Sequence, residues 1–511
     1  MAKGKLSFKA EVAEGRTPPP PEVINWRIIL LAITASFGGL CYGYDLGFIG
    51  SVLALPSFEG YFGTDTRGAA YRSMLESNIV AIFQAGCCFG SFAAVPIADK
   101  FGRNGESALS MVYAGRVLTG ASIGATSFLV PVYIAETAPA NIRGRCVGIY
   151  EVAIQIGTMC GFWIGYIFLQ AVSEDSAAQW RGPMGIQLVP GVALNVCMFF
   201  LTETPRHLAK KHNEVRAAET LSYLRNLPMD HAYVREEMAG IMDQVENERA
   251  LTAGTGRFQL IRETFGRNNR VRLYKGVVLM IFFQFSGTNA INYYSPKIFA
   301  SLGFKGTSVK LFATGVYGII RSVATIISML FLTDRFGRVT MLLWGGGIMA
   351  VCMWIIGALI AVYPAQPGAD IVPGQYAAIT LIYVYAVAFC MSYAGIPWIY
   401  CSEIFSLRIR SICVSITTFT HWAFNLCIAK SVPYMIQNTR YGTYFIFASM
   451  LTLGFIWELF CLPETKGVPL EQMDELFGGK SLAQQTQERM QDKSESGTVS
   501  YHEKVDDKQS V

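Results

Sequence analysis

An aspartate and an arginine stand out because both lie within apolar stretches of the chain. Asp45 lies in the apolar stretch 26–48, and Arg116 lies near the start of the apolar stretch 112–135. A lone carboxylate in hydrocarbon is costly, so Arg116 is its expected partner. Protonation of Asp45 would release Arg116, and deprotonation of Asp45 would hold it. The pair can therefore bias an equilibrium between two conformations. The alternative is a purely structural ion pair.

Two charged motifs each occur twice in the chain. The first, D-x-F-G-R, has a glycine that allows a sharp turn between an acid and a base. The second is a glutamate followed seven residues later by an arginine. Such groups form charge-assisted bonds to helix ends and predict a cytoplasmic gate of ion pairs that breaks and reforms, with ordinary loop charge as the alternative. The predicted gate residues are Asp99, Arg103, Glu136, Arg143, Asp334, Arg338, Glu403 and Arg410.

The elements that must position these residues are membrane helices. The 511 residues are 52% hydrophobic and 15% charged, against about 25% charged in soluble proteins. The apolar residues form stretches of about 20, the length that crosses about 30 Å of hydrocarbon. The lipid bilayer is therefore the expected partner. The net charge of +5 does not imply nucleic acid, because basic residues in such a protein mark the cytoplasmic face.

Eleven spans and a long polar linker can be placed along the chain. The linker has helical patterning around 215–226 and 233–247, and it divides the protein into two halves. The predicted spans are 26–48, 77–98, 112–135, 146–170, 184–202, 275–299, 310–332, 339–363, 376–402, 410–436 and 441–462. The predicted organisation is a cytoplasmic tail (1–25), a first half (26–202), a cytoplasmic linker (203–274), a second half (275–462) and a cytoplasmic tail (463–511) that is disordered after about residue 477.

The repeated motifs show that the first half is one helix short. From Asp99 to Glu136 there are 37 residues, whereas from Asp334 to Glu403 there are 69, and the second interval holds two spans. The deficit of about 30 residues is what a helix of about 20 and its loop require. It falls between Arg103 and the apolar stretch that begins at 112.

The same deficit also conflicts with the expected membrane topology. Arg103 and Arg143 would both be cytoplasmic by the positive-inside rule, yet one span cannot begin and end on the same face. Three explanations remain open: a truncated gene product or splice form, a re-entrant segment at 104–135, or a protein that has eleven spans.

Several motifs resemble the sugar porter family of the major facilitator superfamily, and within it the fungal quinate permeases and related fungal sugar transporters. The resemblance covers about residues 26–477. It implies an all-α membrane protein with two six-helix halves, here without the third helix of the N-terminal half. The motifs are YAGRVLTG (113–120), VPVYIAE (130–136), QFSGTNAINYYSP (284–296), PETKG (463–467), SNIVAIFQAG (77–86), GFWIG (161–165) and LSYLRNLP (221–228).

The resemblance also implies the substrate-binding and proton-coupling residues. Proton-coupled members carry an acid and an arginine at the positions of Asp45 and Arg116. Two departures concern the substrate: Phe283 replaces a second glutamine, and His421 stands where an amide is usual. Packing between helices is the alternative for any of the polar candidates. Those that match the family's binding positions are Gln284, Asn289, Tyr293, Tyr294, Trp398 and Asn425, together with His421.

Glu151 and Arg321 are two further charges expected inside spans. Glu151 stands where sugar porters often have a glutamine, and the helices that carry the two residues meet across the halves in this superfamily. We therefore expect that they either pair across the cavity or that Arg321 binds an anionic substrate. A carboxylate substrate such as quinate would favour the second option.

The expected function is uptake of a monosaccharide, with a proton, by alternating access in the plasma membrane. Quinate uptake is the alternative, and a non-transporting sensor or a truncated inactive product is the alternative of another class. We expect no enzyme, no cofactor and no metal site, because the sequence has no nucleotide loop, metal-ligand spacing or catalytic triad. The 12 cysteines are interpreted as packing residues.

Overall fold

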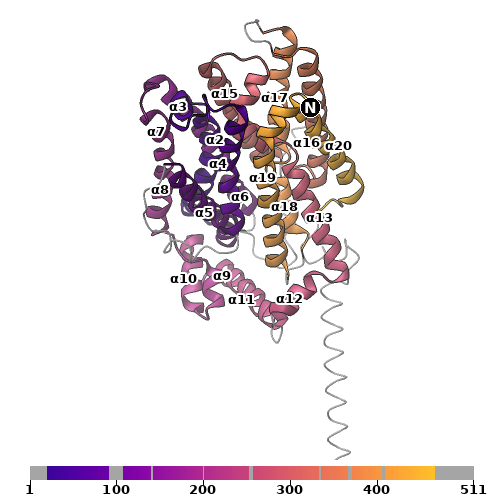
Figure 1. The fold of residues 1–511 in the computed structure, drawn as a ribbon. Coiled ribbons are helices and arrows are strands. Elements are labelled where there is room, and N and C mark those ends of the chain that lie inside the picture. Colours follow the sequence, from indigo (N-terminus) through magenta and orange to yellow (C-terminus); the bar gives the residue numbers. More distant parts are fainter. Residues whose placement is uncertain are drawn as a thin grey trace, which may run out of the picture.

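A computed structural model describes residues 20–90, 108–139, 142–199, 201–252, 257–332, 335–365, 371–405 and 409–466, and these ranges are almost entirely helical. Figure 1 shows two groups of long helices side by side, with short helices below them. The first group and the linker contain α1 (Trp26–Ala35), α2 (Phe37–Val52), α3 (Pro56–Phe62), α4 (Ala69–Gly90), α5 (Ala108–Thr137), α6 (Arg143–Ala171), α7 (Ala178–Ile186), α8 (Leu188–Met198), α9 (Pro205–Lys210), α10 (Glu214–Arg225), α11 (Ala232–Thr252) and α12 (Arg257–Thr264).

The second group is also built of long helices, several of which are interrupted. It contains α13 (Arg267–Gln284), α14 (Thr288–Ser301), α15 (Thr307–Ile327), the short π-helix Ser328–Leu332, α16 (Arg338–Val362), α17 (Pro373–Met391), α18 (Ile396–Glu403), α19 (Arg410–Thr439) and α20 (Gly442–Cys461). The predicted spans 275–299 and 376–402 are each divided into two helices. At the first division Gly287 has a φ of 91°, a left-handed conformation that glycine adopts readily.

Eight helices in the described ranges are long and apolar enough to cross a membrane, compared with eleven predicted spans. The difference has a physical cause. The predicted spans 184–202 and 275–299 are divided into short helices, and α4 carries Glu76, Asn78 and Gln84, which lower its hydropathy. Interruption and polar content thus remove these three predicted spans, whereas α2 with Asp45 and α15 with Arg321 still meet the criterion.

The linker helices define one end of the bundle, which we call the linker end. Figure 1 shows α9 to α12 gathered there, with α3 and α7 at the opposite end. The linker is attached to the first half by hydrogen bonds. Asn25 Nδ2 donates to the Leu224 carbonyl oxygen (2.9 Å), and Arg225 Nη1 donates to the Thr137 carbonyl oxygen (2.8 Å). The start of α1 and the end of α5 therefore both lie at the linker end.

Close packing at glycines fixes α2, the helix that carries Asp45, against α6. A Cβ atom at Gly43 would lie 1.8 Å from the Ile154 carbonyl oxygen, and one at Gly47 would lie 2.2 Å from the Thr158 carbonyl oxygen. Small residues that allow two backbones to approach are the usual means of helix association in a bilayer. This packing holds Asp45 at a fixed depth within the first half.

Helices α4 and α5 pack closely and run in the same direction. Phe83 lies beside Gly120, and Cys87, one turn later on α4, lies beside Gly124. Contacts whose numbers rise together along both helices require parallel axes. Parallel neighbours need a connection that returns along the whole bundle, and residues 91–107 are all that the chain provides. A crossing helix alone needs about 20 residues. The geometry thus supports the predicted deficit, and the number of spans stays a prediction.

Candidate functional site

The predicted charged pair lies deep in the first half. The Arg116 guanidinium on α5 is in ion-pair contact with Asp45 Oδ1 on α2, and the two side chains are 6% and 0% exposed. Gln187 Nε2, at the start of α8, donates a second hydrogen bond to Asp45 Oδ1 (2.9 Å). Arg116 also lies over the Phe83 ring, 4.4 Å from its centroid. A buried acid with one cation and one amide is an arrangement that protonation can change without a large rearrangement.

Helix α14 is the centre of a second polar group that joins the two halves. Gln84 Nε2 of α4 donates to the Tyr293 hydroxyl oxygen (2.6 Å), and Asn425 Nδ2 of α19 also approaches that oxygen (3.4 Å). At the break before α14, Asn289 Nδ2 donates to Gln284 Oε1 (2.8 Å). The neighbouring Tyr294 points elsewhere and donates to the Ala429 carbonyl oxygen (2.8 Å).

His421 lies among aromatic rings on the same helix as Asn425, one turn away. Its ring centroid is 4.6 Å from that of Trp398 and 5.0 Å from that of Phe283. Both of its ring nitrogens are buried without a hydrogen-bond partner. The same is true of Gln284 Nε2 and Asn425 Oδ1. Buried polar groups are rarely left unpaired without a reason, and here both donors and acceptors stay available for a hydroxylated ligand.

Arg321 and Glu151 are joined through a third residue and do not contact each other directly. Arg321 Nε donates to Gln155 Oε1 (3.1 Å), and Gln155 Nε2 donates to Glu151 Oε1 (3.1 Å). The Arg321 guanidinium is 3% exposed, and Nη1 donates to neutral oxygens of Thr288 (2.9 Å), Asn292 (3.0 Å) and Tyr317 (3.0 Å). In the part of the chain that the structure describes, no carboxylate is in ion-pair contact with this cation.

The charged motifs of the predicted gate are only partly covered. Asp99, Arg103 and Asp334 lie outside the described residues, as does the side chain of Arg143. Glu136 accepts a hydrogen bond from the Thr204 hydroxyl (2.7 Å). Arg338 Nη2 contacts Glu403 Oε1 (3.2 Å), and Arg410 Nη2 donates to the Phe405 carbonyl oxygen (3.5 Å). Each of these contacts lies within one half.

Glu464 of the PETKG motif has a defined structural role at the start of α16. Its carboxylate accepts the backbone N–H groups of Arg338 (2.7 Å), Val339 (3.1 Å) and Thr340 (3.3 Å). An acid at a helix N-terminus satisfies donors that have no partner within the helix and interacts favourably with the helix dipole. The PETKG motif thus fastens the chain after α20 to the start of α16.

Glu464→Ala is expected to lower the free energy of unfolding by about 1–2 kcal/mol, because the first turn of α16 loses its capping acceptor. A lower melting temperature of the purified protein in detergent would show this loss. Glu219→Ala, on the exposed face of α10, is the matched control and should leave the melting temperature unchanged. Equal melting temperatures for Glu464→Ala and the control would contradict the capping role.

Six polar residues of the site were not among the predicted ones: Gln84, Gln155, Gln187, Thr288, Asn292 and Tyr317. Gln155 had a signal, since it lies four residues after Glu151 and hence on the same helix face. Asn292 and Thr288 lie within the QFSGTNAINYYSP motif. Gln187 has no comparable signal, because only the packing of α8 against α2 brings it to Asp45.

Comparison with known proteins agrees with this geometry. The family model described as "Sugar (and other) transporter" matches residues 31–110 and 104–477. A probable quinate permease of Neosartorya fischeri is 39% identical over 493 residues, covering 91% of this chain and 90% of the relative. One of Aspergillus clavatus is 40% identical over 493 residues, with the same coverage.

Among solved structures, the proton:xylose symporter XylE bound to 6-bromo-6-deoxy-D-glucose superposes with a TM-score of 0.70 at 24% identity, covering 88% of this chain and 99% of that protein. A partially occluded inward-open form of the xylose transporter XylE from E. coli gives a TM-score of 0.68 at 23% identity, covering 86% and 99%. The two-half helical bundle thus has the fold of these solved structures. The chain belongs to the sugar transporter family.

The matches also bear on the missing span. The two matched segments of the family model meet at residues 104–110, where the sequence predicts the deficit. The alignment with the Neosartorya relative is 493 positions long but covers 91% of 511 residues, which is about 465. About 28 aligned positions therefore have no counterpart in this chain, roughly the length of one span with its loop.

Proposed function

We propose that this protein carries a cyclic, hydroxylated carboxylic acid of the quinate type across the plasma membrane together with a proton. The linker end and both termini face the cytoplasm in this proposal, in keeping with the basic residues of the linker. The two halves tilt about the site between them, so that the site opens first to one side and then to the other.

The observation that carries this proposal is the buried cation Arg321 without a carboxylate in contact. A charge in this position is expensive and marks a functional site by default. A guanidinium also matches the geometry of a carboxylate, to which it can donate two parallel hydrogen bonds. A substrate carboxylate would supply the anion, and its ring hydroxyls would meet the unpaired groups of Gln284, His421 and Asn425.

A neutral monosaccharide is the second candidate substrate. The Trp398 ring, 4.6 Å from His421, offers an aromatic face, and the amides of Gln84, Gln284 and Asn425 offer hydrogen bonds of both kinds. Groups of this type suit any ring with several hydroxyls. The charge of the substrate is therefore what separates the two candidates.

Proton coupling rests on Asp45 and Arg116 in this proposal. The ionised carboxylate of Asp45 on α2 holds the Arg116 side chain of α5. Protonation of Asp45 removes the charge that holds it. Because Arg116 also contacts α4 through Phe83 and the Ile79 carbonyl oxygen (3.4 Å), its release would loosen α4 from the first half. Since Gln84 of α4 reaches Tyr293, this change is transmitted to the substrate site.

Arg321→Gln should reduce uptake of labelled quinate about 10- to 100-fold, because an interaction with a buried charge is lost, and should change uptake of glucose or xylose far less. Uptake of the three compounds into cells that express the protein, measured at two external pH values, tests this. Arg181→Gln is the matched control, since Arg181 is an exposed arginine of α7. If Arg321→Gln leaves uptake and substrate preference unchanged, the anionic substrate is ruled out.

A further inference from the structure

Four charged side chains form a cluster at the end of the bundle opposite the linker, which we call the outer cluster: Glu59, Arg72, Glu76 and Lys297. Glu59 belongs to α3, Arg72 and Glu76 to α4, and Lys297 to α14 of the second half. Arg72 contacts both acids, and Lys297 Nζ contacts Glu76 Oε2. Two acids and two bases are thus arranged in alternation.

Glu76 is the buried member on which the cluster depends. Its side chain is 2% exposed, whereas those of Lys297, Arg72 and Glu59 are 27%, 32% and 23% exposed. Arg72 Nε donates to Glu76 Oε1 (2.8 Å), so the carboxylate is turned with its other oxygen toward Lys297. Burial raises the pKa of the Glu59 carboxyl, and the Arg72 charge opposes that rise. Through its ion pair with Arg72, Glu59 fixes the position of Arg72, and Arg72 in turn orients Glu76.

The outer cluster acts on the same two helices as the substrate site. Lys297 lies four residues after Tyr293 on α14, beyond the kink at Tyr294, and Gln84 lies eight residues after Glu76 on α4, so each helix contributes one residue to each contact. Contacts Glu76–Lys297 and Gln84–Tyr293 therefore join α4 to α14 at two levels. The outer contact is electrostatic, and the inner one is formed by residues of the site.

The halves are joined by further polar contacts at this same end. Lys430 Nζ of α19 contacts the Ser77 hydroxyl (3.2 Å) and Asn78 Oδ1 of α4. Ser73 donates to Gln437 Oε1 (2.8 Å), and Gln170 Nε2 of α6 donates to the Ser308 hydroxyl of α15 (2.6 Å). At the linker end, by contrast, the contacts of Glu136, Glu403 and Glu464 do not join the two halves: Glu136 bonds to Thr204 of the linker, and the two other acids contact the second half.

We propose that the Lys297–Glu76 pair is a latch that closes the outer face and holds α14 over the substrate site. Lys297 is a positioning residue: it acts through α14, and thereby through Tyr293. When the halves separate at this end, water reaches both charges and each is solvated independently. In the closed state a nearly buried carboxylate needs both of its cations, because removing one partner of such a pair leaves a charge without compensation.

The test measures the fraction of molecules closed at the outer face, without any substrate. Nitroxides are attached to ketone-bearing residues at Gly60 of α3 and Asn438 of α19, both exposed, so that the native cysteines remain. Electron–electron distance distributions are recorded for the full chain in lipid nanodiscs. Lys297→Gln should lower the ratio of closed to open molecules about tenfold. The effect is smaller than for a fully buried ion pair because Lys297 is only partly buried.

Four further variants make the result specific: Lys297→Arg, Glu76→Gln, the double variant of Glu76→Gln with Lys297→Gln, and Lys305→Gln. Lys297→Arg keeps the charge and should keep the closed fraction, which also shows that position 297 tolerates substitution. Glu76→Gln combined with Lys297→Gln should cost less than the two single effects added, since no unpaired charge remains. Lys305→Gln, an exposed lysine beyond α14, is the control. An unchanged distribution in Lys297→Gln, or strictly additive effects, would overturn the latch.

The latch presupposes transport by alternating access but not a particular substrate. A failure of the distance measurement would leave the selectivity of Arg321 untouched. Conversely, a chain that prefers a neutral sugar would still show the Lys297 effect. The two proposals therefore stand or fall on separate measurements.

Discussion

Asp45→Asn is expected to abolish accumulation of substrate against its gradient, while exchange of substrate across the membrane persists. The amide cannot ionise, so Arg116 loses its anion and the site can no longer take up and release a proton. One proton cancels the charge of a carboxylate substrate, so the pH gradient drives accumulation, with about 1.4 kcal/mol or a tenfold concentration ratio per pH unit. The accumulation ratio should therefore fall to about one, and its dependence on external pH should disappear.

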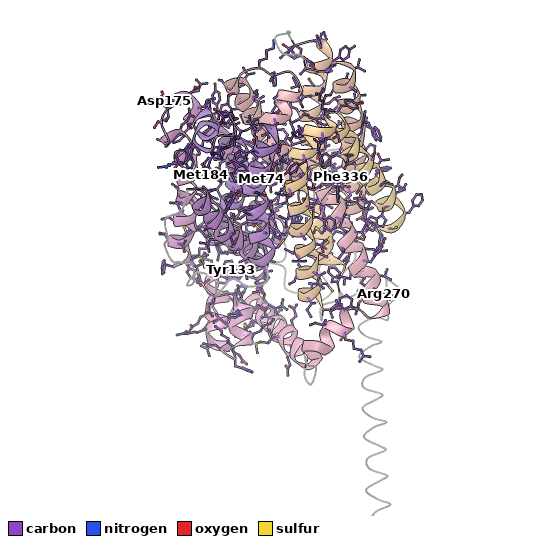
Figure 2. All side chains as sticks on the ribbon, viewed as in Figure 1. Met74, Tyr133, Asp175, Met184, Arg270 and Phe336 are labelled. Carbon is purple, nitrogen blue, oxygen red and sulfur yellow. The ribbon has the colours of Figure 1, made fainter. Side chains whose placement is uncertain are left out.

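Proteoliposomes with an imposed potential and pH gradient allow both quantities to be measured. Net accumulation and substrate counterflow are compared for the wild type, Asp45→Asn and the control Asp175→Asn. Asp175 is exposed, and Figure 2 labels it at the periphery of the bundle, far from the interface of the halves. Loss of both accumulation and counterflow would point to a structural ion pair, and unchanged accumulation would exclude Asp45 from coupling.

Insertion of about 30 residues between Arg103 and Tyr113 should produce the second large effect, a gain of transport. Helices α4 and α5 run parallel, so we expect a returning span between them, and residues 91–107 are fewer than a crossing helix with its turns requires. Supplying the corresponding segment of the Neosartorya relative completes twelve spans. Even 1–2 kcal/mol of added stability changes the folded-to-unfolded ratio about 5- to 30-fold, and uptake should rise accordingly.

The same insertion makes a prediction about topology that does not depend on activity. With twelve spans, tags at the N-terminus, in the linker and at the C-terminus should all be protected from protease in sealed, right-side-out vesicles. An insertion of equal length made of Gly and Ser is the control and should restore neither topology nor uptake. Sequencing the transcript across Arg103 to Tyr113 should reveal an alternative form with about 30 more codons. Uptake that is no higher with the insertion than without it would contradict the expected gain.

Much of the architecture follows from the sequence because the bilayer is a simple solvent. Apolar stretches of about 20 residues must become helices, since no water satisfies backbone groups in hydrocarbon. The repeated motifs place equivalent turns in the two halves, and the interval between them shows where a helix is lacking. A similar argument applies to Asp45: an acid in an apolar stretch needs a cation, and Arg116 was the expected partner because it also lies in an apolar stretch.

Only the tertiary structure decided which groups meet across long separations in the sequence. Glu151 and Arg321 were expected to pair, or Arg321 to bind an anionic substrate, and Gln155 lies between them because the rotation of α6 presents Glu151 and Gln155 to α15. Glu76 and Lys297 have no sequence signal that links them, and their contact depends on how α4 crosses α14. A sequence shows that a buried charge needs a partner, whereas helix packing selects the partner, because only packing fixes distance and direction.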